Sequence, residues 1–198
     1  MIKGIIFDFG GPILHSSGWR DVFNSYDGYY NLPPGTVDKI MDDYLKVAHA
    51  GDCTTFDQFF EMEKYQSPLD ANQLTQIWDE TDDALTIDQD MVNLIKSYKS
   101  DYKIALLSNF TNDLVEVLER FKIAHLFDAV VNSSIIKTPK PYPGAYWHTL
   151  EQIKLAPEQT VFIDDLPLNV RGAEEVGIKG ILYENFQQTK SELEKYLN

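Results

Sequence analysis

The strongest constraint on the fold comes from short apolar runs that do not alternate with polar residues. The first is IKGIIFDF at residues 2–9, and similar runs occupy 103–108, 160–164, 179–183 and, more weakly, 128–133. A strand with one face in water alternates apolar and polar residues, whereas a parallel strand covered on both faces need not alternate. The runs therefore predict a parallel sheet buried between two layers.

Helical patterns separate these runs in the second half of the chain. Leu114, Val117, Leu118 and Phe121 have the spacing of one helix face, and Pro143 suits the first turn of another helix. Strands that alternate with helices from about residue 100 onward indicate βαβ units. We therefore predict an α/β fold with a Rossmann-like parallel sheet.

The segment at 16–85 has a different character. It is rich in aromatic and acidic residues and contains no convincing buried strand. An apolar helical stripe includes Val37, Ile40, Met41, Tyr44 and Ala48. We expect a helical domain at 16–85, inserted after the first strand of a core domain made of 1–15 and 86–198. Most of the aromatic residues in this segment, Trp19 among them, are expected to pack in its interior.

Composition limits the partners of the protein. The net charge is −14 over 198 residues, and nucleic acids and anionic membranes attract lysine and arginine, so we expect neither as a partner. No stretch approaches the ~20 apolar residues of a membrane span. Cys53 is the only cysteine, and Asp8 interrupts the N-terminal apolar run. We therefore expect a cytoplasmic monomer or homodimer without a signal peptide or an intramolecular disulfide.

Polar side chains stand where the predicted strands end. They are Asp8, Ser108, Asn109, Asp164 and Asp165, together with Lys140 before a proline-started helix. Singly, each is typical of a turn, a helix cap or a solvated surface. Ligands of open parallel sheets bind at the carboxyl ends of the strands, however, so we expect these groups to converge on one site.

This set of groups suits phosphoryl transfer. Asp8 could attack phosphorus and form an aspartyl-phosphate. Carboxylate and phosphate repel one another, so a divalent cation must bridge them, and Mg²⁺ takes oxygen ligands such as Asp8 and Asp165, with Asp164 in support. The Ser108 hydroxyl and the Lys140 ammonium would hold the remaining phosphate oxygens.

The chain resembles the haloacid dehalogenase superfamily of hydrolases, most of which are phosphatases. FDFGG at 7–11 is similar to its first motif, LLSN at 106–109 to the second, the lysine of KPYPG at 140–144 to the third, and FIDDLPLNVRGAEEVG at 162–177 to the fourth. The motifs have the right order and spacing over nearly the whole chain. The helical insertion is similar to the cap of subfamily I, which lies after the first motif and closes over substrate.

The resemblance implies a role for the residues on the phosphate side of the site. Asp8 would be the nucleophile, and Lys140 and Ser108 would bind phosphate. Asn109 would line the substrate site.

The resemblance also implies a magnesium site. Asp8, Asp165 and the backbone carbonyl of Gly10 would be ligands, and Asp164 would lie in or beside that shell. Asn169 would contact a metal-bound water.

One position departs from the phosphatase pattern. The family usually has a second aspartate two residues after the nucleophile, which acts as general acid and base, and this chain has Gly10. Such groups typically contribute ~10²–10⁴-fold to the rate. We therefore hypothesise slow turnover, a leaving group that needs little help, or a replacement acid, for which His15 is one candidate.

The predicted function is that of a Mg²⁺-dependent phosphatase that acts on a small phosphorylated metabolite, such as a sugar phosphate, through an aspartyl-phosphate. Two alternatives stay open. A haloacid dehalogenase would need no metal, so the pair Asp164–Asp165 disfavours it. A weakly active or inactive regulatory binding protein is favoured by Gly10 and disfavoured by the other motif residues.

Overall fold

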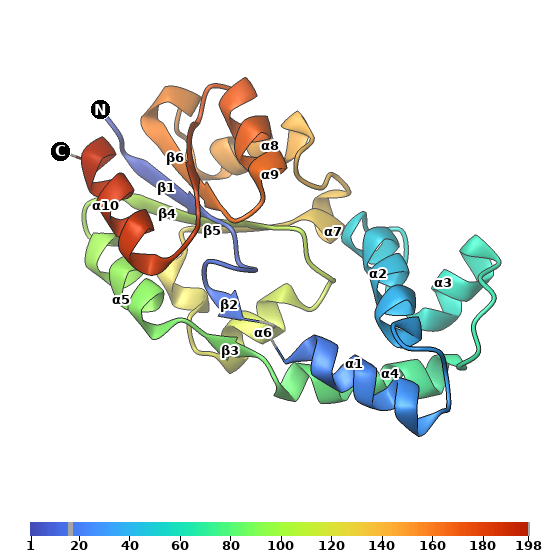
Figure 1. Cartoon of the computed structure of the whole chain (residues 1–198). Coiled ribbons are helices and arrows are strands. Elements are labelled where there is room, and N and C mark those ends of the chain that lie inside the picture. The colour runs from blue at the N-terminus through green and yellow to red at the C-terminus, as the bar shows by residue number, and fades with distance from the viewer. Residues whose placement is uncertain (16–17, 198) are drawn as a thin grey trace.

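A five-stranded parallel sheet forms the core of the larger part of the protein in a computed structural model that describes residues 1–15 and 18–197 (Figure 1). Its strand order is β5-β4-β1-β6-β7, and every neighbouring pair is parallel. The strands are β1 (Gly4–Phe7), β4 (Lys103–Ser108), β5 (Ala129–Asn132), β6 (Thr160–Asp164) and β7 (Lys179–Leu182). The predicted α/β fold with a parallel sheet is confirmed, although β1 is shorter than the apolar run that predicts it.

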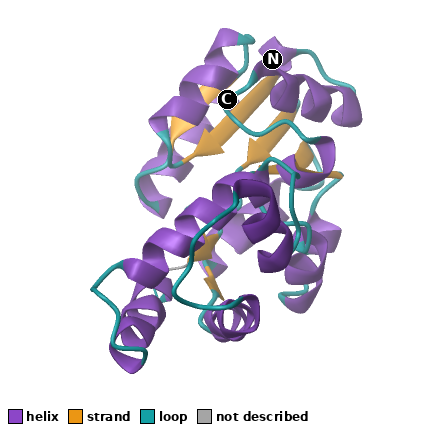
Figure 2. Ribbon diagram, turned by 90° about the vertical axis from the view of Figure 1, so that its right-hand side faces the viewer, coloured by secondary structure: helices purple, strands orange, loops and turns teal. Residues whose placement is uncertain are grey.

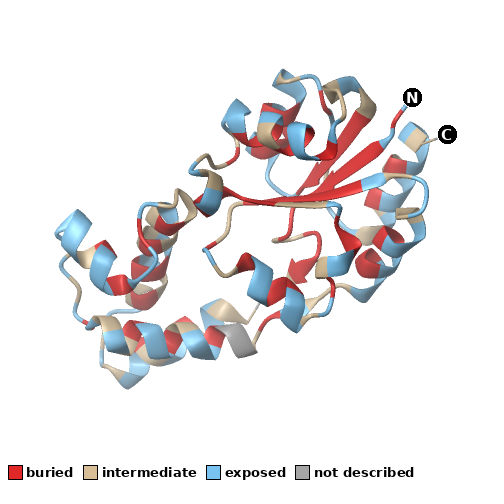
Figure 3. Cartoon of the chain, turned by 180° about the vertical axis from the view of Figure 1, so that it is seen from behind, coloured by how far each residue is buried: buried red, intermediate tan, exposed pale blue. Residues whose placement is uncertain are grey.

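Helices cover both faces of this sheet (Figure 2). The helices around the sheet are α5 (Gln89–Tyr98), α6 (Leu114–Arg120), α7 (Ser133–Ile136), α8 (Pro143–Ile153), α9 (Pro167–Glu175) and α10 (Phe186–Leu197), with 3-10 turns at Ala124–Leu126 and Pro157–Gln159. Ile5 and Phe7 belong to one apolar cluster with Met91 of α5, whereas Ile6 belongs to another with Tyr146 of α8. Successive residues of β1 are buried on opposite faces, and for that reason the run does not alternate. Figure 3 shows the strands of the sheet largely in the colour of buried residues.

Four helices form a separate layer beside the carboxyl edge of the sheet, here called the helical unit (Figure 1). They are α1 (Trp19–Tyr29), α2 (Thr36–His49), α3 (Phe56–Glu63) and α4 (Ala71–Asp83). The unit has its own apolar cluster, which includes Met41, Phe59 and Leu74. The chain leaves the sheet through β2 (Leu14–His15) and returns through β3 (Thr86–Ile87), which pair antiparallel. A helical insertion after the first strand is therefore present, as the sequence predicts.

The C-terminal end of α2 rests on α7 of the sheet layer. The Ser133 hydroxyl donates a 2.6 Å hydrogen bond to the carbonyl oxygen of His49. Gly51 has φ +79°, and a Cβ atom built on it would lie 2.0 Å from the carbonyl oxygen of Ser134. Only glycine permits this approach, because it tolerates positive φ and has no side chain.

Across residues 1–15 and 18–197, the helices are too short or too polar to cross a lipid bilayer.

Candidate active site

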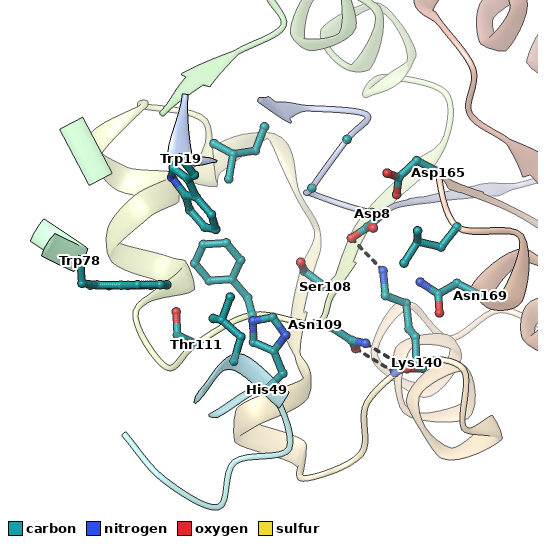
Figure 4. Close-up of a pocket in the computed structure, with 16 residues that line it drawn as sticks. Asp8, Trp19, His49, Trp78, Ser108, Asn109, Thr111, Lys140, Asp165 and Asn169 are labelled. Carbon is teal, nitrogen blue, oxygen red and sulfur yellow. Dashed lines mark hydrogen bonds and ion pairs between the residues drawn. The ribbon is translucent and has the colours of Figure 1, made fainter. Parts of the chain in front are cut away.

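A cavity of about 360 Å³ lies between the carboxyl edge of the sheet and the helical unit (Figure 4). Both layers contribute to its walls. Seven of the residues singled out from the sequence line it, namely Asp8, Gly10, Ser108, Asn109, Lys140, Asp165 and Asn169. The structure therefore brings the ends of β1, β4 and β6 together at one place, as expected for a parallel sheet.

Lys140 forms the centre of the polar end of this cavity. Its Nζ lies 2.7 Å from Oδ1 of Asp8 and 2.7 Å from Oδ2 of Asp164. Lys140 and Asp164 are buried, and Asp8 is only 7% exposed. A buried ammonium between two carboxylates is fixed in position, because moving it would leave unpaired charge in a region of low polarity.

Asp164 is fully buried and both of its oxygens accept hydrogen bonds. Oδ1 accepts from the backbone N–H of Leu166 at 2.8 Å, and the Asn169 amide donates to both oxygens at 3.1 Å. Together with Lys140 these donors hold the Asp164 carboxylate in place and connect it to the start of α9.

Asn109 is similarly engaged with the backbone of Lys140. Its Nδ2 donates to the Lys140 carbonyl oxygen at 2.9 Å, and its Oδ1 accepts from the Lys140 N–H at 2.8 Å. The pair of bonds ties the end of β4 to the loop that carries Lys140. The sequence predicted that Asn109 lines the site, and the structure adds this positioning contact.

The electrostatic environment alters the ionisation of the central pair. Burial raises the pKa of Asp8 to about 7; Asp164 adds to the rise and Lys140 opposes it. Burial by itself lowers the pKa of Lys140, but Asp8 and Asp164 outweigh it and raise that pKa, so the ammonium stays charged. A cation bound beside Asp8 would oppose this rise and favour the ionised carboxylate.

Asp165 completes an acidic group that suits a cation. Carboxylate oxygens of Asp8, Asp164 and Asp165 lie within 4.8 Å of one another. Partial desolvation at the cavity floor, together with the charge of Asp164, raises the pKa of Asp165. Three carboxylates face the single ammonium of Lys140, and oxygen donors are the ligands that Mg²⁺ prefers. The residues present thus fit a magnesium ion.

Two adjacent glycines, Gly10 and Gly11, form the turn that follows β1, and their surroundings differ. Gly11 has φ +85°, and a Cβ there would lie 2.6 Å from the Asp165 carboxyl group, so only glycine fits. A Cβ on Gly10 would have no heavy atom within 4 Å. Gly10 is therefore required neither by positive φ nor by lack of space, and the cavity has room for a side chain at this position.

The candidate replacement acid His15 is not among the residues that line the cavity. It lies on β2, where its Nε2 is 3.6 Å from Oδ2 of Asp88. A different histidine, His49 at the end of α2, lines the cavity instead. Burial, reinforced by Lys140, lowers the pKa of His49 to about 4, so its imidazole is neutral at pH 7.

Sequence reasoning also missed an apolar wall. Its members are Leu14, Trp19, Leu45, Trp78 and Phe110. They come from five different segments, and their spacing in the sequence indicates burial without indicating what they face. For Trp19 the expectation of interior packing is half right, because its ring lies 5.6 Å from that of Trp78 and also borders the cavity.

Comparison with known families gives a match over most of the chain. A family model described as haloacid dehalogenase-like hydrolase matches residues 5–183. This range contains all of the candidate site residues and the helical unit.

Similar curated proteins include two phosphatases. The fructose-1-phosphate phosphatase YqaB of Escherichia coli is 24% identical over 188 residues, covering 90% of this chain and 94% of its own. The sesquiterpene phosphatase astK of Aspergillus oryzae is 25% identical over 181 residues, covering 90% and 88%.

Solved structures share the fold. A haloacid dehalogenase family enzyme from Bacteroides thetaiotaomicron, in complex with magnesium and inorganic phosphate, superposes with a TM-score of 0.70 at 21% identity, covering 93% of this chain and 95% of its own. The L-2-haloacid dehalogenase of Xanthobacter autotrophicus superposes with a TM-score of 0.67 at 19% identity, covering 98% of this chain and 83% of its own.

Proposed function

This chain belongs to the haloacid dehalogenase-like hydrolase family, and on that basis we propose that it is a Mg²⁺-dependent phosphatase. Its substrate would be a small phosphate monoester, cleaved through an aspartyl-phosphate on Asp8. The observation that carries the proposal is the ion pair of Asp8 with buried Lys140 beside Asp165, at the floor of a cavity. A hydrolase that works without a metal would not need a second cavity-lining carboxylate such as that of Asp165, which lies within 4.8 Å of the Asp8 carboxylate.

Phosphate would bind between Lys140 and Ser108. The Ser108 hydroxyl lines the cavity and has no hydrogen-bond partner within residues 1–15 and 18–197, so it is available to donate to a phosphate oxygen. The Lys140 ammonium has a third donor beyond those used by Asp8 and Asp164. These two groups would balance the charge that spreads over the phosphate oxygens during transfer.

Asp8 would act through its Oδ2. Its Oδ1 already accepts from the Phe9 N–H at 2.6 Å and contacts Lys140. Oδ2 attacks phosphorus, the bond from phosphorus to the alcohol oxygen breaks, and the alcohol leaves after gaining a proton. Water then attacks the same phosphorus, the bond to Asp8 breaks, and inorganic phosphate is released.

Asp8, Asp165 and the Gly10 carbonyl are the proposed magnesium ligands. A bound Mg²⁺ would supply the positive charge that lets two anions, carboxylate and phosphate, approach. Asp164 and Asn169 would position Lys140 and the start of α9 around that centre, because their polar atoms are already engaged with one another.

The test is phosphate release from phenyl phosphate. We expect steady release with Mg²⁺ and loss of activity on chelation, because the paired carboxylates repel phosphate without a cation. Mg²⁺ should also raise the melting temperature, on the order of 5 °C at ~100-fold excess over Kd. Release of halide from a haloacid without metal, with no release of phosphate, would contradict the proposal.

Asp165→Asn separates metal binding from folding. Asp165 is exposed, so the variant should keep the melting temperature of metal-free wild type and lose most of the rise with Mg²⁺. Asp101→Asn, also exposed and remote from the cavity, is the matched control and should keep that rise. An undiminished rise in Asp165→Asn would remove Asp165 from the ligand set.

We further propose that residues 16–85 act as a cap that closes on the core formed by 1–15 and 86–198. The antiparallel pair β2–β3 would serve as its hinge, because both chain crossings lie there. The contact of α2 with α7 would mark the closed arrangement.

Gly51→Ala tests this closure. A Cβ atom 2.0 Å from the Ser134 carbonyl oxygen must separate α2 from α7. Because a displacement of about 1 Å can cost ~10²-fold in rate, we expect kcat/KM to fall roughly ten- to a hundredfold. The measurement is steady-state kinetics on phenyl phosphate.

Gly35→Ala is the matched control. Gly35 also has positive φ, +81°, but a Cβ there meets nothing within 4 Å. Both variants therefore share the backbone strain, and only Gly51→Ala disturbs the contact with α7. Equal kinetic effects in the two variants would count against closure through this contact.

A further inference from the structure

The cavity has two ends of opposite character. The polar end consists of Asp8, Lys140 and Asp165, and the labelled rings of Trp19 and Trp78 lie on the side away from it (Figure 4). The apolar wall of Leu14, Trp19, Leu45, Trp78 and Phe110 forms the other end of the cavity. A phosphate held at Lys140 would thus direct its alcohol portion toward aromatic and aliphatic surface.

Most polar atoms near this wall are already engaged within the protein. Trp19 Nε1 donates to the carbonyl oxygen of Thr81 at 3.1 Å, and the Thr111 hydroxyl bonds to the Asp113 carboxylate. Asn109 uses both ends of its amide on Lys140. The His49 imidazole is an exception, with no hydrogen bond to another residue in the described ranges. A substrate with many hydroxyls would lose water here without gaining equivalent partners.

The wall also lacks a counterion for a second anion. Among the described residues that line the cavity, Lys140 alone carries a permanent positive charge, and it is balanced by Asp8 and Asp164. The chain as a whole carries −14. A carboxylate or second phosphate on the alcohol portion would be desolvated against apolar side chains.

We propose that the substrate is the phosphate monoester of a small, uncharged and mainly apolar alcohol, such as a benzyl-type or branched alkyl alcohol. This inference rests on the proposed phosphatase function. The cavity of about 360 Å³ stands near the lower end of the ~300–1,000 Å³ range of ligand sites, so the alcohol is of modest size. One polar group on it can be met by His49.

Three phosphates test the class. Benzyl phosphate and fructose 1-phosphate both release a primary alcohol, so they differ chiefly in the polarity of the body, and 4-carboxybenzyl phosphate adds one charge. We expect kcat/KM for benzyl phosphate to exceed that for each of the others roughly ten- to a hundredfold. Equal values, or a preference for fructose 1-phosphate, would overturn the inference.

Variants of the wall locate the preference. Trp78→Ala should lower the ratio of kcat/KM for benzyl phosphate to that for acetyl phosphate roughly tenfold, because acetyl phosphate has almost no apolar body to bury. Trp147→Ala is the matched control, since Trp147 lies on α8, is 51% exposed and does not line the cavity. Trp78 also packs on Tyr44, so Trp78→Ala removes a packing contact inside the helical unit as well as part of the wall. Leu45→Gln changes the wall at a different position, and it should shift the ratio in the same direction.

The outcomes separate this inference from the proposed function. Phosphate release from acetyl phosphate with an unchanged ratio in Trp78→Ala and Leu45→Gln would overturn the apolar substrate class and keep the phosphatase. No Mg²⁺-dependent release from any of the four phosphates would overturn both.

Discussion

Phosphate release is expected to fall by on the order of 10⁴-fold or more when Asp8 is replaced by asparagine, because an amide cannot serve as the nucleophile. The variant should still fold. Lys140 keeps its 2.7 Å contact with Asp164, and the raised pKa of Asp8 shows that its charge is costly in this buried position. The loss would therefore be one of chemistry and not of structure.

Two measurements make this result interpretable. Acid quenching of wild type during turnover of ³²P-labelled substrate should trap label on the protein, and Asp8→Asn should carry none. The melting temperature of the metal-free variant should equal or exceed that of wild type. Retention of wild-type turnover in Asp8→Asn would remove Asp8 from the nucleophile role.

The second large effect is a gain of activity in Gly10→Asp. The added carboxyl group would stand where the family usually has its general acid and base, a contribution of ~10²–10⁴-fold. The structure has room for it, since a Cβ on Gly10 meets nothing within 4 Å. We expect a gain on the order of 10²-fold for benzyl phosphate and a small one for phenyl phosphate, because phenol leaves without much protonation.

Gly10→Asn is the matched control for that gain. Asn has the shape of Asp but no group that can act as an acid or a base near neutral pH, so it should not accelerate benzyl phosphate cleavage. The neighbouring Gly11 offers no such opportunity, because φ is +85° and Asp165 lies 2.6 Å from a Cβ there. If Gly10→Asp and Gly10→Asn behaved alike, proton transfer to the leaving group would not limit turnover.

The sequence was informative where a local rule decides the structure. The non-alternating run around Ile5 and Phe7 predicted a doubly covered strand, and β1 is buried on both faces. The edge rule for parallel sheets predicted that Asp8, Ser108 and Asp165 meet at one edge, and all three line the same cavity. Both predictions follow from the strands alone and do not depend on how the helices pack.

What the sequence could not supply depends on contacts between distant segments. His15 was attractive because it is close to Asp8 in sequence, yet the pairing of β2 with β3 sets it beside Asp88. His49 lines the cavity from the end of α2, a helix that packs against α7, and the sequence does not indicate this packing. The two bonds from Asn109 to the Lys140 backbone likewise join segments that no periodicity relates.

Helix α2 both lines the cavity and contacts α7, and this combination affects how the substrate range of the protein could evolve. Leu45 and His49 shape the cavity, while the turn of α2 that ends at His49 and the adjoining Gly51 meet Ser133 and Ser134. A substitution that shifts α2 to make room for a different alcohol would also disturb its contact with α7. Changes of substrate range on this helix would therefore succeed mainly in company with compensating changes on α7, so the route to a new specificity would be a path of paired mutations.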